Sequence, residues 1–268
     1  MRDIKIISLG ENCLIDEILK DFKLRKETFP FGSGRFNIEY ILSICKDDFK
    51  NLLNTQYLRY AEVEGIRVVK NSFYSSQNSI YHSTVCDDVE FTHHDLFQPK
   101  IRESLERKIQ RFQMALENPQ DFVFMYYYRY SDFRNSVSLI EELKKWIAWV
   151  ENKSKQKPRV VLISQELIDN RSQRRVKVKK HDWGLEATLH TLDIWTGPEQ
   201  WSAPQDRDLF DELLNANTTL QFMYGEDWFL EKIRRKIQKI RDQFNQLKFR
   251  IKAIIKKLLH PTIRDQIQ

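Results

Sequence analysis

Ile4-Lys5-Ile6-Ile7-Ser8-Leu9-Gly10-Glu11-Asn12-Cys13 is the stretch that decides the fold. Its apolar, β-branched half predicts a strand over residues 4–9 that ends at Gly10. Helical spacing begins at Leu14, so the sequence predicts Cys13 near the N-terminus of a helix. Unpaired backbone N–H groups and the helix dipole favour a thiolate at such a place. Cys13 is therefore a candidate nucleophile, and a small buried cysteine is the alternative.

A nucleophilic cysteine needs a base, because Glu11 and Asp16 oppose thiolate formation. The stretch Phe91-Thr92-His93-His94-Asp95-Leu96-Phe97 offers an imidazole and an orienting carboxylate in one loop. Adjacent residues of an extended chain face opposite ways, so we expect at most one of the two histidines to face Cys13. Candidate bases elsewhere in the chain are His181 and His190.

Further strands and helices alternate along the chain. Apolar runs predict strands over 122–128, 159–164 and 176–180, and amphipathic spacing predicts helices over 100–116 and 137–150. This order predicts an α/β fold: an open, mostly parallel sheet with helices on both faces. Ligands of such sheets lie at the carboxyl ends of the strands. The residues that we expect there are Cys13, Arg129, Ser164 and His181.

Length and composition limit the possible classes of protein. The chain has 268 residues, of which 41% are hydrophobic, and we expect one α/β domain over 1–225 with an appendage over 226–268. Three cysteines without a CxxC pair argue against disulfides and against a metal site. We find no secretory signal and no apolar run long enough to span a bilayer, so we expect a cytoplasmic protein.

The positive charge is concentrated in the tail. Residues 231–268 carry 12 Lys and Arg and three acids, or +9, whereas the whole chain carries +6. The preceding part is therefore slightly acidic, which argues against nucleic-acid binding.

Apolar residues of the tail recur at alternating spacings of three and four from Ile233 to Leu258, as in a long amphipathic helix with a coiled-coil seam. A homodimer through this seam is possible, but the flanking Lys and Arg would repel each other in a parallel pair. An anionic membrane surface suits the segment 230–259 better, so we expect peripheral attachment to the inner face of a membrane.

The string from Ser8 to Cys13, followed by Leu24-Arg25 and Phe29-Pro30-Phe31, resembles the bacterial family named as putative papain-like cysteine peptidases, a domain of unknown function. The resemblance covers about residues 1 to 200. It implies that Cys13 is the nucleophile and that His94, with Asp95 beside it, is the base. Members of the family often carry Asp-Trp after the Pro-Phe pair, where this chain has Gly32-Ser33.

The Asn12-Cys13 element also resembles, more weakly, a family of capsular-polysaccharide acetyltransferases, which implies that coenzyme A is a possible cofactor. The predicted α/β order fits that family better than a papain-like α+β fold, which is the alternative. We expect substrate-binding residues around the cysteine and at the sheet edge: Ser8, Gly10, Asn12, His93, Arg129 and His181.

These features predict a cysteine-dependent hydrolase or acyltransferase that acts on a cell-envelope polysaccharide precursor or another membrane-linked glycan or acyl substrate. A non-catalytic scaffold of a polysaccharide synthesis or export system, with a buried Cys13, is one alternative. A glycosyltransferase is another, although the sequence has no Asp-x-Asp metal motif and no glycine-rich phosphate loop.

Overall fold

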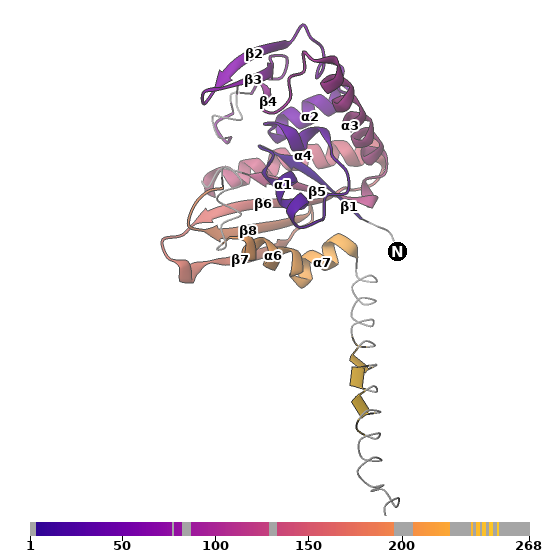
Figure 1. Ribbon diagram of the computed structural model, residues 1–268, viewed down its shortest axis with the longest axis vertical. Coiled ribbons are helices and arrows are strands. Elements are labelled where there is room, and N and C mark those ends of the chain that lie inside the picture. The colour runs from indigo at the N-terminus through magenta and orange to yellow at the C-terminus, as the bar shows by residue number, and fades with distance from the viewer. Residues whose placement is uncertain are drawn as a thin grey trace, which may run out of the picture. The chain divides into compact units, whose positions relative to one another are not determined.

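In a computed structural model of the chain, β1 (Lys5–Gly10) is the edge strand of a five-stranded sheet (Figure 1). The structure describes residues 4–76, 78–81, 87–128, 133–195 and 206–225, and eight single residues of the tail. The chain divides into two compact units, a body over residues 1–223 and a tail over residues 224–268.

The sheet has the order β1-β5-β6-β8-β7. Its other strands are β5 (Phe122–Tyr128), β6 (Arg159–Leu167), β7 (Arg175–Lys180) and β8 (Leu185–Thr191). Four strands run parallel, and β7 runs antiparallel to β8. Because β5 lies inside the sheet, it is almost entirely buried, as a parallel sheet covered on both faces requires.

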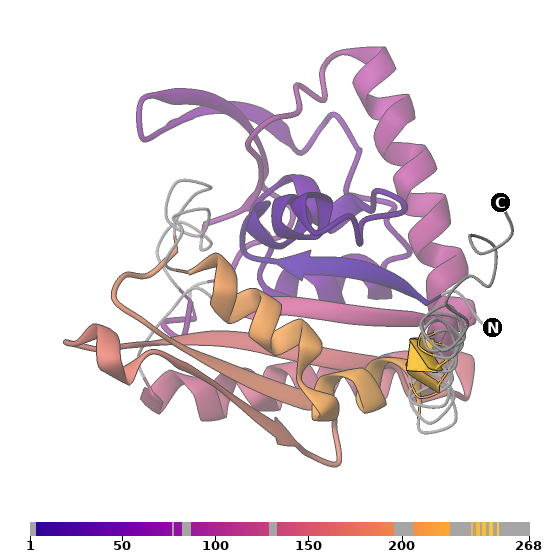
Figure 2. The ribbon, with the colours of Figure 1, turned by 60° about the horizontal axis from the view of Figure 1, so that its bottom comes forward.

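Helices cover both faces of the sheet. The apolar residues of α2 (Ile38–Lys46), α3 (Pro99–Glu117) and α4 (Phe133–Ser154) form one core cluster with Ile7 and Phe124. The helix α6 (Arg207–Asn215) covers the other face (Figure 2). Phe22, which directly follows α1 (Leu14–Asp21), packs against Phe210 of α6, with ring centroids 5.4 Å apart. A short helix, α7 (Asn217–Tyr224), follows. The predicted α/β fold is therefore confirmed, and the papain-like α+β alternative is not the architecture of this chain.

The strand order after β6 differs from the prediction. We expected residues 176–180 to continue the parallel series, but they form the antiparallel edge strand β7, and residues 185–191 pair with β6 in parallel. Between β6 and β7 the chain makes only a 3-10 turn, η4 (Arg171–Gln173). A parallel connection needs a dozen or more residues, and only the path through β7 to β8 provides them.

A second, antiparallel sheet contains β2 (Leu58–Val63), β3 (Ile66–Asn71) and β4 (Val89–Phe91). Glu64 and Gly65 have φ angles of 52° and 76°, as a two-residue hairpin turn between β2 and β3 requires. This sheet lies at one end of the body, beside α2 (Figure 1).

A short backbone bridge joins the two sheets. After the 3-10 turn η1 (Pro30–Ser33), the N–H of Arg35 donates to the carbonyl of Glu90 at 2.8 Å, and the N–H of Phe36 donates to the carbonyl of Gly10 at 3.3 Å. A Cβ atom on Gly34 would overlap the carbonyl oxygen of Glu90. The close approach of β4 to the end of β1 therefore depends on a glycine at position 34.

In the tail, the described residues Ile237, Ile240, Phe244, Leu247 and Ile251 are helical and about half exposed. The remaining residues of the predicted helix 230–259 lie outside the described part, so its length stays a prediction. No helix among the described residues combines the length and the apolar character needed to cross a bilayer.

Replacing Gly34 by Ala should lower the free energy of unfolding by about 1–3 kcal/mol, because the methyl group forces the bridge away from Glu90. Thermal or urea unfolding measures this loss. The control is Gly65→Asn: the site has no atom within 4 Å of an added Cβ, and asparagine tolerates a positive φ. Equal stability of wild type and Gly34→Ala would show that the bridge is not needed.

Candidate active site

Cys13 occupies the N-cap position of α1, directly after the end of β1. Its side chain makes no capping hydrogen bond. The side-chain oxygen of Asn12 caps the helix instead, by accepting a hydrogen bond from the N–H of Leu14 at 3.0 Å. Gly10 permits the tight turn, since a Cβ there would lie 3.0 Å from the carbonyl oxygen of Asn12. The half-buried sulfur is thereby left available for chemistry.

Burial raises the pKa of the Cys13 thiol above its ordinary value of 9.0. The carboxylates of Glu17 and Asp16 raise it further, whereas the backbone N–H of Cys13 and the guanidinium of Arg35 lower it. The thiol is therefore protonated at neutral pH, and its use as a nucleophile requires a base that removes the proton during attack.

His93 is the imidazole that the structure places beside this sulfur. Its Nε2 lies 3.9 Å from Cys13 Sγ, across 80 positions of sequence. The ring belongs to the loop after β4 and is exposed to solvent. A long contact of this kind is typical of an unliganded site, where the hydrogen bond shortens when substrate binds.

His94, which the family resemblance favoured as the base, is held elsewhere. Its Nε2 lies 3.1 Å from Lys108 Nζ, and its ring also bonds the main chain of His93. Lys108 in turn donates to Ser33 Oγ at 3.0 Å. Burial and the Lys108 charge lower the pKa of His94, which favours a neutral ring. The contacts among His94, Lys108 and Ser33, here called the clamp, join α3, η1 and the loop that carries His93.

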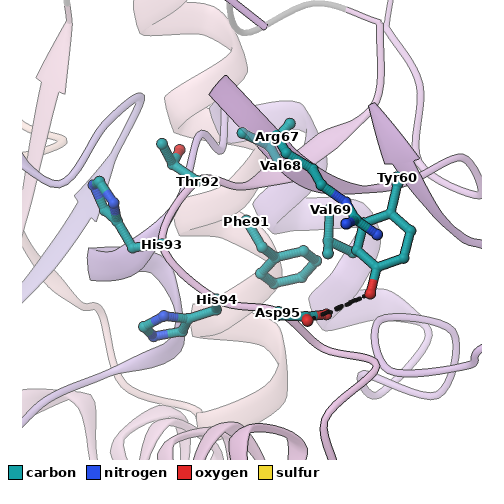
Figure 3. A pocket seen from close by; sticks show the side chains of 9 residues that line it. All are labelled: Tyr60, Arg67, Val68, Val69, Phe91, Thr92, His93, His94 and Asp95. Carbon is teal, nitrogen blue, oxygen red and sulfur yellow. Dashed lines mark hydrogen bonds between the residues drawn. The ribbon is translucent and has the colours of Figure 1, made fainter. Parts of the chain in front are cut away.

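Asp95 does not orient either histidine. Its carboxylate accepts hydrogen bonds from Tyr60 Oη, from the N–H of Phe97 and from Gln98 Nε2, each at 3.1 Å. Figure 3 shows it pointing toward Tyr60 and away from both imidazole rings. Among the described residues, no carboxylate is hydrogen-bonded to His93, so the described site is a cysteine–histidine pair.

Two predicted substrate-binding side chains, Ser8 and Asn12, precede the cysteine in the sequence. Ser8 is buried in β1 and Asn12 is buried in the turn that follows. Ser8 Oγ and Asn12 Nδ2 have no hydrogen-bond partner within the described part of the chain. Buried donors without partners are costly, which makes the Asn12 amide a candidate group for binding a substrate oxygen.

The remaining candidates do not join this site. His181 bonds Glu186 at 2.7 Å and stacks on Trp183. Because β7 is antiparallel, its end lies beside the start of β8, so His181 lies at the amino ends of the parallel strands and not at their carboxyl ends, contrary to our prediction. His190 is buried in β8, 3.7 Å from Glu166. Arg129 lies outside the described residues.

Arg35 is a site residue that the sequence did not reveal. Its guanidinium contacts Glu64 at 3.0 Å and Glu90 at 3.5 Å, and it is close enough to lower the pKa of Cys13. No motif marks it, because only the backbone bridge brings it to the cysteine. No group of three His, Cys, Asp or Glu side chains in the described ranges could hold a metal ion.

Replacing Lys108 by Gln removes the positive charge beside His94, so the pKa of His94 should rise toward 6.5. Titration of the ring by NMR measures this shift. Lys100→Gln, the same change at an exposed position of α3, is the control and should leave the pKa unchanged. An equal His94 pKa in wild type and Lys108→Gln would contradict the clamp.

The sequence matches the family described as putative papain-like cysteine peptidase (DUF1796) over residues 4–166, which is more than half of the chain. The match covers Cys13, Arg35 and the loop with His93. Comparison with curated proteins and with solved structures gave no match. The chain therefore belongs to the family of putative papain-like cysteine peptidases, which indicates cysteine-dependent hydrolase activity.

Proposed function

We propose that the chain hydrolyses an acyl bond, with Cys13 as the nucleophile and His93 as the general base. The observation that carries this proposal is the 3.9 Å contact between Cys13 Sγ and His93 Nε2 at the N-terminus of α1. A half-buried, protonated thiol beside an exposed imidazole is a productive pair, because the imidazole can take the proton as the sulfur attacks.

In the first step, Sγ bonds to the carbonyl carbon and the thiol proton passes to His93 Nε2. The tetrahedral intermediate expels its leaving group, which takes that proton from His93, and a thioester remains on Cys13. Water, deprotonated by His93, then attacks the thioester, and the acid and the thiol are released. The Asn12 amide, whose Nδ2 has no partner within the described part of the chain, is the donor that we propose for the oxyanion, and the positive end of the α1 dipole adds to its effect.

p-Nitrophenyl acetate tests this chemistry without knowledge of the natural substrate. We expect rapid release of nitrophenol and an acetyl group on the tryptic peptide that contains Cys13. Cys13→Ser should remove the adduct, and His93→Asn should slow acylation about 100-fold or more, since general-base catalysis contributes this much. The control is His181→Asn, which removes an imidazole bound to Glu186 outside the site. Acylation of Cys13 at the same rate in His93→Asn would refute the proposed base.

We also propose that the tail attaches the enzyme to an anionic membrane, where a membrane-linked substrate would be found. Ile240, Phe244 and Leu247 are 53–58% exposed, and Lys248 Nζ lies 5.4 Å from the centroid of the Phe244 ring. Apolar side chains beside cations suit the interface of such a membrane, where each basic residue adds about 1 kcal/mol. A polysaccharide precursor as substrate and coenzyme A as acyl donor stay predictions, which no described residue favours.

Sedimentation of the full chain with phosphatidylcholine vesicles, with and without phosphatidylglycerol, tests the attachment. Ile240→Glu should lower binding to the anionic vesicles about tenfold, because the variant loses an apolar side chain that the bound membrane would bury. Gln243→Glu adds the same charge at a polar position of the tail and should have a smaller effect. Equal binding of both variants, or a concentration-dependent dimer that Ile240→Glu dissociates, would overturn the proposal.

A further inference from the structure

A pocket of about 270 Å³ lies between the hairpin β2–β3 and the loop that carries the proposed base. Its floor is apolar, and polar groups line its two ends. His93 lies at one end, whereas Tyr60, Arg67 and Asp95 lie at the other (Figure 3). The volume suits one small group of a larger ligand.

The Arg67 guanidinium packs over an aromatic ring. Its central carbon is 3.6 Å from the centroid of the Tyr60 ring, whose centroid is in turn 4.6 Å from that of the Phe97 ring. This contact limits the movement of the guanidinium, whose N–H groups can bind a planar oxyanion. Among the described residues, no carboxylate is hydrogen-bonded to Arg67.

Asp95 is the neighbouring carboxylate, but it already has its partners. Tyr60 Oη, the N–H of Phe97 and Gln98 Nε2 each donate a hydrogen bond to its carboxylate. The acid therefore holds the Tyr60 ring under Arg67, and it attracts the guanidinium by its charge without a hydrogen bond to it. A guanidinium has five N–H groups, and the contact of Arg67 with Tyr60 uses only part of them.

We propose that this pocket binds a carboxylate of the acyl substrate, and that Arg67 on its Tyr60 support recognises it. The inference rests on the proposed function, since His93 forms the other end of the pocket and would act on the bond being cleaved. Arginine binds a carboxylate through two parallel N–H···O hydrogen bonds. The substrate class is thus an acyl compound or peptide with an acid group a short distance from the reacting carbonyl.

Iodoacetamides with a tethered carboxylate test the proposal on the full chain. The reagents carry the acid on linkers from the length of glycine to that of aminohexanoate, and each has a matched primary amide. The rate constant for alkylation of Cys13, read by peptide mass spectrometry, is compared between acid and amide. We expect the ratio to peak at one linker length, about fivefold above that of the shortest linker, as for a partly exposed ion pair.

Arg67→Gln should remove this peak, and Arg67→Lys should keep part of it. Arg59→Gln is the matched control, because Arg59 is an exposed arginine of the neighbouring strand and pairs with Asp88 at 2.7 Å. Arg59 does not line the pocket, so Arg59→Gln should leave alkylation by both the acids and the amides unchanged.

A ratio that does not depend on linker length, or a peak that persists in Arg67→Gln, would overturn the carboxylate site and leave the proposed function standing. Failure of Cys13 to react with the amide reagents would instead overturn the proposed function, and the inference with it. The two failures are therefore distinguishable in one data set.

Discussion

The site depends on the backbone bridge of Arg35 and Phe36. One N–H of the bridge bonds Gly10 at the end of β1, and the other bonds Glu90 in β4. Cys13 follows Gly10 by three residues, and His93 follows Glu90 by three residues. Two segments that are far apart in the sequence are thus joined next to their reactive side chains. Together with the shared core and the contacts of Lys108, the bridge thus fixes the separation of the two sheets.

The same bridge sets the electrostatics of the cysteine. It brings the Arg35 cation close, but Glu64 and Glu90 share that charge. Desolvation, assisted by the acids of the first turn of α1, therefore dominates, and the pKa of Cys13 is raised. A resting thiolate is therefore not favoured here. The site is better suited to a thiol that loses its proton only when a substrate carbonyl is present.

Local patterns explain which parts of this arrangement the sequence could predict. The strand that ends at Gly10 and the helix that begins at Leu14 follow from neighbouring residues, so the place of Cys13 was predictable, as was the parallel core. The choice between the two histidines was not, because Lys108, fourteen positions further along, takes His94 and leaves His93. Arg35 and the order of β7 and β8 likewise depend on long-range contacts that no local pattern encodes.

The proposed nucleophile and the proposed carboxylate pocket lie on different elements. Cys13 stands between β1 and α1, whose apolar residues are buried, and rigid elements of this kind position a reactive atom precisely. The pocket uses exposed side chains of a hairpin, Tyr60 and Arg67, which lie on the same face of the small sheet as the buried Val69. Exposed side chains of this kind can change without loss of core packing. Substrate preference is therefore expected to vary at the hairpin, and the cysteine chemistry to depend on the residues around Gly10 and Arg35.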